Sequence, residues 1–132
     1  MKLALVRNWR KKPRVEKARL EPGEITVHVV PGGNQLTVAV AGRTTVDSSP
    51  YLRSVLLGLL RAGATRVVAV DLSAVSYLDM SGIATLLEAL KAASERSVKL
   101  RLSGMRGQVR TLAEIAQLDT IYRAWGSEVE FR

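Results

Sequence analysis

Apolar and polar positions alternate in two short segments, residues 24–30 and residues 36–41. A period of two is typical of strands with one buried face. The segment between them, Pro31-Gly32-Gly33-Asn34, has the composition of a turn. The two segments therefore predict a β-hairpin. Its buried positions would be Ile25, Val27, Val29, Leu36, Val38 and Val40.

The next segment has the spacing of a helix. Ser49 is suited to the N-cap and Pro50 to the first helical position, and Gly63 is suited to the end of the helix. A strand is predicted next at Arg66–Val70, and its apolar run Val67–Val70 is typical of a central strand with helices on each side. Strand, helix and strand in this order predict a parallel, right-handed crossover. The apolar stripe of the helix would be Leu52, Val55, Leu56, Leu59 and Leu60.

A second helix is predicted from Met80 to about Ser94. Asp79 is the expected N-cap, because its carboxylate can accept from the free amides of Ser81 or Gly82. Glycine inside a helix costs about 1 kcal/mol relative to alanine. One candidate reason for Gly82 is the close approach of another chain.

The remaining pattern predicts a strand at residues 98–102 near the sheet edge, a last helix and a short edge strand at residues 128–131. Tyr122 and Trp125 are expected to cover the core. The order β-β-α-β-α-β-α, with a possible final strand, predicts an α/β fold: a mixed sheet of about four to five strands with helices packed against it. Loops 42–49 and 72–81 would then meet beyond the carboxyl ends of parallel strands, placing Ser81 on an exposed rim.

Charge divides the chain into two parts. The net charge of +8 is concentrated in residues 1–22, which hold eight of the 20 basic residues and two of the 12 acidic ones. Residues 23–132 are close to neutral, which argues against direct nucleic-acid binding by this domain. The leader is interpreted as a flexible basic tail, as sequence upstream of the true start, or as a weak membrane contact through residues 1–19.

Few residues are available for catalysis. Cysteine is absent and His28 is the only imidazole, so we expect no metal site, no cofactor and no enzymatic activity. An enzyme using Ser81 as nucleophile would need a base within hydrogen-bond reach, and His28 lies on a flanking strand. The sequence also lacks an apolar run of the roughly 18 residues that a membrane span needs.

Two motifs carry a family resemblance. Asp71-Leu72-Ser73, Val75 and Leu78-Asp79-Met80-Ser81-Gly82 before an apolar helix closely resemble the STAS domain of bacterial anti-sigma factor antagonists. Ser49-Pro50, followed by Leu52-Arg53, resembles the loop-to-helix pattern of that family. The resemblance covers roughly residues 24–126.

The resemblance implies a cytoplasmic phosphorylation switch. Ser81 matches the serine that a partner anti-sigma factor, itself a serine protein kinase, phosphorylates, and a phosphatase restores the binding form. Asp79 and Gly82 would shape the site. The surface expected to bind the partner comprises Thr45, Asp47, Ser48, Asp79, Met80, Ser81 and Gly82.

The chain departs from the family pattern at two places. Gly42-Arg43-Thr44-Thr45 stands where the family usually carries Gly-Glu-Leu-Asp, so a carboxylate is missing at Thr45, and Asp47 is the nearest substitute. Met80 replaces a frequent serine, which leaves Ser81 as the sole acceptor in the motif. One alternative is a STAS regulatory subunit of a lipid-trafficking ABC transporter, with a transporter ATPase as partner. Another is that Ser81 is a helix-start serine that only satisfies backbone amides.

Overall fold

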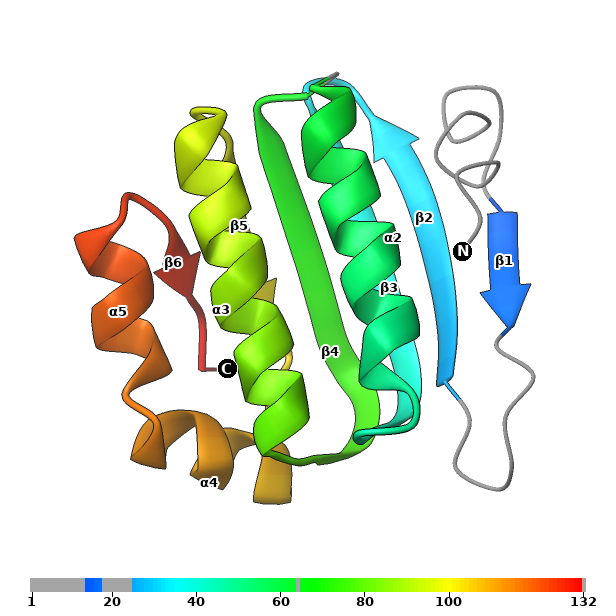
Figure 1. Ribbon diagram of the computed structural model, residues 1–132, viewed down its shortest axis with the longest axis vertical. Helices are drawn as coiled ribbons and strands as arrows, with labels where there is room; N and C mark the ends of the chain where they lie inside the picture. Colours follow the sequence, from blue (N-terminus) through cyan, green and yellow to red (C-terminus); the bar gives the residue numbers. More distant parts are fainter. Residues whose placement is uncertain (1–13, 18–24, 64, 132) are drawn as a thin grey trace.

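The computed structural model describes residues 14–17, 25–63 and 65–131, and its strands form one sheet with helices packed on it (Figure 1). The helices and strands follow one another in this order: β1 (Arg14–Lys17), β2 (Ile25–Gly32), β3 (Gln35–Thr44), α2 (Ser49–Ala62), β4 (Val67–Leu78), α3 (Met80–Glu95), β5 (Lys99–Ser103), α4 (Gly107–Ile115), α5 (Leu118–Ala124) and β6 (Glu128–Val129).

The sheet is mixed, and its strands lie in the order in which they occur along the chain. β1, β2 and β3 are antiparallel neighbours, and β3 to β6 are parallel. The predicted α/β class, the hairpin and the parallel crossover are confirmed. The sheet has six described strands rather than four or five, because residues 14–17 of the leader add β1 to the edge. The domain boundary at residue 23 stays a prediction.

The helices cover one face of the sheet. In Figure 1, α2 and α3 lie side by side in front of β3, β4 and β5, and no described helix lies behind β4. The prediction of helices on both sides of the central strand is therefore wrong. On the other face Ala69 is buried but Val67 and Asp71 are only half-buried. Parallel strands laid down in sequence by right-handed crossovers place every connecting helix on the same side.

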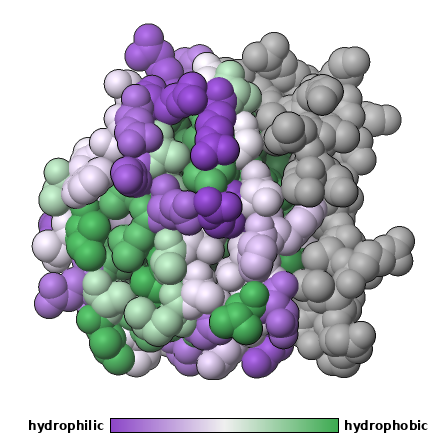
Figure 2. All heavy atoms as spheres, in the orientation of Figure 1, coloured by the Kyte–Doolittle hydropathy of each residue, from purple (hydrophilic) through white to green (hydrophobic). Residues whose placement is uncertain are grey.

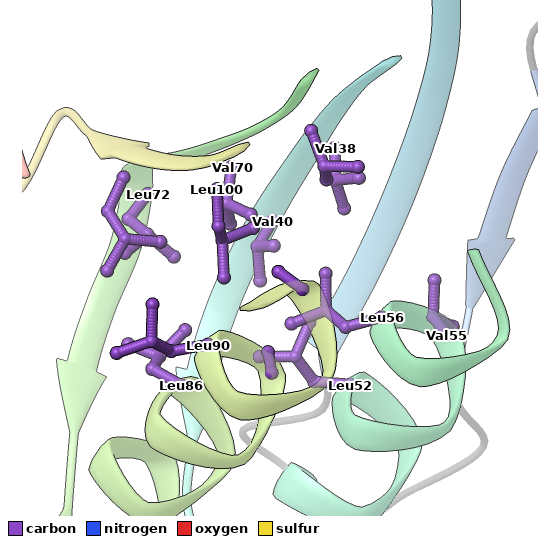
Figure 3. Packing of buried hydrophobic residues seen from close by; sticks show 14 of the residues in the cluster. Val38, Val40, Leu52, Val55, Leu56, Val70, Leu72, Leu86, Leu90 and Leu100 are labelled. Carbon is purple, nitrogen blue, oxygen red and sulfur yellow. The ribbon is translucent and has the colours of Figure 1, made fainter. Parts of the chain in front are cut away.

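The core lies between this helix layer and the sheet. Figure 3 shows Val38, Val40, Val70 and Leu100 of the strands pointing toward the two central helices. The predicted apolar stripe of α2 and the inward positions of the hairpin are all within this cluster, each at most 1% exposed, which confirms both patterns. From the helices the same cluster receives Leu52, Leu56, Leu86 and Leu90.

The central strand β4 is longer than its sequence pattern suggests. It continues past Asp71 to Leu78 beside β3, so the predicted loop 72–81 is mostly strand and loop 42–49 shortens to residues 45–48. Two register shifts against β3 add residues to β4, and they break its alternation. As a result Leu72, Val75 and Leu78, spaced by three, are all buried.

The last third of the chain forms two short helices where one was predicted. Tyr122 is fully buried and its hydroxyl donates to the Leu86 carbonyl at 2.5 Å, so its predicted place over the core is confirmed. Trp125 is 49% exposed, which makes the same prediction wrong for this residue. Figure 2 shows apolar side chains over the α4 and α5 end of the helical face, where Ile115 is 73% exposed.

Candidate functional site at the start of helix α3

The site lies where two parallel strands end together. Thr44 at the end of β3 is paired with Leu78 at the end of β4, and the Asp79 amide then donates to the Thr44 carbonyl at 3.1 Å. Ser81 follows in the first turn of α3 and is half-buried. The sheet therefore holds Ser81 at its carboxyl edge, as predicted, but the residue is half-buried there rather than fully exposed.

Asp79 caps α3 with one carboxylate oxygen. Its Oδ1 accepts from the amides of Ser81 (2.9 Å) and Gly82 (3.1 Å) and from the Ser81 hydroxyl (2.5 Å), while Oδ2 accepts from the Val46 amide (3.2 Å). Partial burial works to raise the pKa of Asp79, but the hydrogen bonds from Ser81, Gly82 and Val46 together hold it below its ordinary value. The predicted cap is confirmed, and Asp79 is a carboxylate at neutral pH.

The hydroxyl of Ser81 is held between two helices. It donates to Asp79 in its own helix start and accepts from the Ser49 hydroxyl, at 3.2 Å, from the first residue of α2. The predicted N-cap of α2 is wrong by one residue: Ser48 occupies the cap position and Pro50 lies in the first turn, which frees the Ser49 hydroxyl to reach Ser81. The first turns of α2 and α3 therefore meet at one oxygen.

Loop 45–48 is fixed by its own hydrogen bonds. The buried Ser48 hydroxyl donates to the Arg43 carbonyl (2.6 Å) and accepts from the Thr45 amide (2.9 Å), and Thr45 Oγ1 accepts from the Asp47 amide (3.2 Å). Because the loop is also tied to Asp79 through Val46, its position is coupled to the start of α3.

Gly82 has a reason inside the fold. A Cβ at this position would lie 2.3 Å from Leu78 Cδ1 and 3.0 Å from Thr44 Cγ2, so a side chain would collide with the strand ends. Both neighbours are buried. Close packing of α3 on β3 and β4 therefore accounts for the glycine within this chain, and the approach of another chain stays a prediction.

The residues predicted to bind a partner divide into two groups. Met80 (61% exposed) and Asp47 lie at the surface, and Thr45, Asp79 and Ser81 are half-buried. Ser48 and Gly82 are buried and shape the surface from within. Val46, which the sequence did not single out, is 67% exposed beside them. The partner-binding role of this surface stays a prediction.

The only imidazole lies elsewhere. His28 on β2 shares a hollow of about 310 Å³ with Asp71 and Ser73, and Ser81 is not among the residues that line it. Within the described residues no three His, Asp or Glu side chains gather as metal ligands, and no helix there is long and apolar enough to cross a membrane.

Sequence reasoning missed the ion pair that joins α2 to α3. Arg53 Nε and Nη2 each donate to a Glu88 carboxylate oxygen at 2.7 Å, and the side chains are 48% and 44% exposed. The hydrogen bond from Arg53, which outweighs the opposing desolvation, lowers the pKa of Glu88. Figure 2 shows hydrophilic side chains over this pair of helices. The two residues are 35 positions apart, so no local pattern relates them.

The sequence and the fold match those of a known domain family. Residues 27–123 match the family model described as "Mlab, STAS domain". The chain belongs to the STAS domain family. A Staphylococcus aureus protein (strain NCTC 8325 / PS 47) described as "Anti-sigma-B factor antagonist" is 34% identical over 94 residues, which cover 70% of this chain and 86% of that protein. A Staphylococcus epidermidis protein of the same description is 33% identical over 94 residues, with the same coverage of both chains.

Solved structures share the STAS fold. An anti-sigma factor antagonist from Mycobacterium paratuberculosis aligns with a TM-score of 0.69 and 20% identity, over 82% of this chain and 88% of that one. The Bacillus cell fate determinant SpoIIAA, solved in its phosphorylated form, aligns with a TM-score of 0.61 and 12% identity, over 80% and 90% of the two chains. At these identities the likeness concerns the fold alone.

Proposed function

We propose that this STAS domain is an anti-sigma factor antagonist: a non-enzymatic, cytoplasmic module that binds an anti-sigma factor with serine kinase activity and releases it when Ser81 is phosphorylated. The observation that carries the proposal is the Ser81 hydroxyl itself, half-buried at the sheet edge and oriented by Asp79 and Ser49. The curated relatives, which are 33–34% identical, support the class of partner.

Phosphorylation would form a bond between Ser81 Oγ and the γ-phosphorus of ATP and break the bond from that phosphorus to the bridging oxygen, so that ADP leaves. The serine proton leaves through the Asp79 carboxylate, to which the hydroxyl already donates, and passes from it to solvent. The product carries about −1.5 to −2 charges beside that carboxylate. A partner surface that fits a neutral hydroxyl would then face a hydrated dianion. The loss of a few kcal/mol corresponds to a roughly 100-fold weaker complex.

The test is phosphorylation by a candidate anti-sigma kinase. The full chain is incubated with the kinase and ATP, the phosphate is mapped by mass spectrometry, and binding to the kinase is measured before and after. We expect label on Ser81 and none in Ser81→Ala. Ser94→Ala, which removes an exposed serine at the far end of α3, is the matched control and should label normally. Label at another residue, or binding unchanged by phosphate, would contradict the proposal.

A second candidate function is a regulatory subunit of a lipid-trafficking ABC transporter, acting through a transporter ATPase. It is kept because the matching family model is described as "Mlab, STAS domain" and its description names no anti-sigma role. Affinity capture with the full chain separates the two. Recovery of a transporter ATPase that binds Ser81→Ala and wild type equally would favour the transporter, and recovery of a kinase would favour the switch.

A further inference from the structure

A phosphate on Ser81 would be pushed away from the cap of its own helix. In the unphosphorylated protein the Ser81 hydroxyl donates to Asp79 Oδ1 at 2.5 Å, and phosphorylation removes the proton of that hydroxyl. The Asp79 carboxylate, which still accepts from the amides of Ser81, Gly82 and Val46, then faces the phosphate as a like charge. Repulsion therefore directs the phosphate toward α2.

α2 offers a hydrogen-bond donor and a cation on the side that faces α3. The Ser49 hydroxyl already donates to Ser81 Oγ. Arg53 is one turn further along α2, about 6 Å by helix rise, and its guanidinium also points to α3, where it holds Glu88. Side chains of a helix lean toward its N-terminus, so the turn that contains Ser49 is the one that Arg53 covers most easily.

Breaking the ion pair between Arg53 and Glu88 costs little free energy. Both side chains are about half exposed, and exposed ion pairs contribute little to stability. A phosphoserine dianion offers arginine a charge-assisted, bidentate contact with about twice the charge of the carboxylate. Two other basic side chains near this edge have partners of their own: Arg43 stacks on the Tyr77 ring, with 4.4 Å between its Cζ and the ring centroid, and Arg106 donates to the Ser73 carbonyl.

We propose that Arg53 is the phosphate-sensing residue of this site: when Ser81 is phosphorylated, its guanidinium leaves Glu88 and pairs with the phosphate. The inference rests on the proposed modification of Ser81 and adds the internal response to it. The exchange releases the Glu88 carboxylate on the exposed face of α3. A partner docked over the starts of α2 and α3 would therefore meet two new negative groups, the phosphate and Glu88, although only one residue is modified.

The test uses full-length protein with phosphoserine encoded at position 81, so that no kinase is needed. Phosphorus NMR then follows the second pKa of the phosphate, which is near 6 for a free phosphoserine. An adjacent guanidinium favours the dianion, so Arg53→Gln should raise this pKa by about half a unit or more. Arg61→Gln removes the same charge from α2 two turns further away and is the matched control, with a shift of less than about 0.2 units expected from distance and salt screening.

A double-mutant cycle tests whether Arg53 moves from Glu88 to the phosphate or only contributes positive charge from a distance. Glu88→Gln should lower the phosphate pKa in the wild-type background, because it frees Arg53, and should have much less effect when Arg53→Gln is already present. Equal effects of Arg53→Gln and Arg61→Gln, or an effect of Glu88→Gln that is independent of Arg53, would overturn the inference. Failure of a kinase to label Ser81 would instead overturn the proposed function and leave this result unchanged.

Discussion

Gly82→Ala tests whether the glycine serves the fold or the partner. The added Cβ would lie 2.3 Å from Leu78 Cδ1, 3.1 Å from Leu78 Cγ and 3.0 Å from Thr44 Cγ2. Leu78 is 1% exposed, so its side chain cannot move into solvent to make room. Overpacking of this kind costs about 1–3 kcal/mol, and alanine in a helix returns about 1 kcal/mol. We expect a net loss of about 1 kcal/mol.

Urea unfolding of the full chain measures this loss. With a slope of about 2 kcal/mol per molar urea, the midpoint should fall by about 0.5 M while the slope stays unchanged. Gly32→Ala is the control, because a Cβ there meets no atom within 4 Å. It should not lower the midpoint. A Gly82→Ala midpoint equal to or above that of the wild type would show that the strand ends yield, and the packing reason for the glycine would be refuted.

Changes at two further residues test the helix cap and the buried phenol. Asp79→Ala should cost about 1–2 kcal/mol as a lost N-cap. Because the folded pKa of Asp79 lies below its unfolded value, its charged form stabilises the fold at neutral pH, and this contribution is lost as pH falls below about 4. Asp79→Asn, which keeps an oxygen at the cap, should flatten that part of an acid-unfolding curve, and an unchanged curve would contradict the assignment. Tyr122→Phe removes the hydrogen bond to the Leu86 carbonyl and should cost about 1 kcal/mol, seen as a fall of a few degrees in the unfolding temperature. Burial raises the pKa of Tyr122, so stability should decline as pH rises past about 10, where the unfolded chain ionises, and Tyr122→Phe should weaken that decline.

The parts of the fold that follow from local pattern were predictable. The hairpin, the stripe of α2 and the Asp79 cap each depend on residues that are close together in the sequence. The length of β4 could not be predicted in this way. Its bulges space the buried residues Leu72, Val75 and Leu78 by three, and this spacing matches neither a regular strand nor a helix. Bulges arise from pairing with β3, and that pairing is invisible in β4 alone.

The same distinction applies to the site. Asp79, Ser81 and Gly82 lie within four successive residues of one motif and could be recognised together. Ser49 and Arg53 could not be connected with it, because their partners on α3 are 32 and 35 residues away and the register between the two helices decides the contacts. Ser49 was instead assigned to the cap, the role that its neighbour Ser48 takes.

The short strand β1 gives the leader a structural role that does not depend on its charge. It pairs with four residues of β2, from Thr26 to Val29, and so shields part of what would be an open border of the sheet. A chain that begins at residue 23 would lack both β1 and the basic residues of the leader. Its β2 would then be an exposed edge strand, to which another molecule can add a strand. If such shortened chains associate with one another, the cause would therefore be the exposed edge of β2 and not the loss of basic residues that could bind lipid.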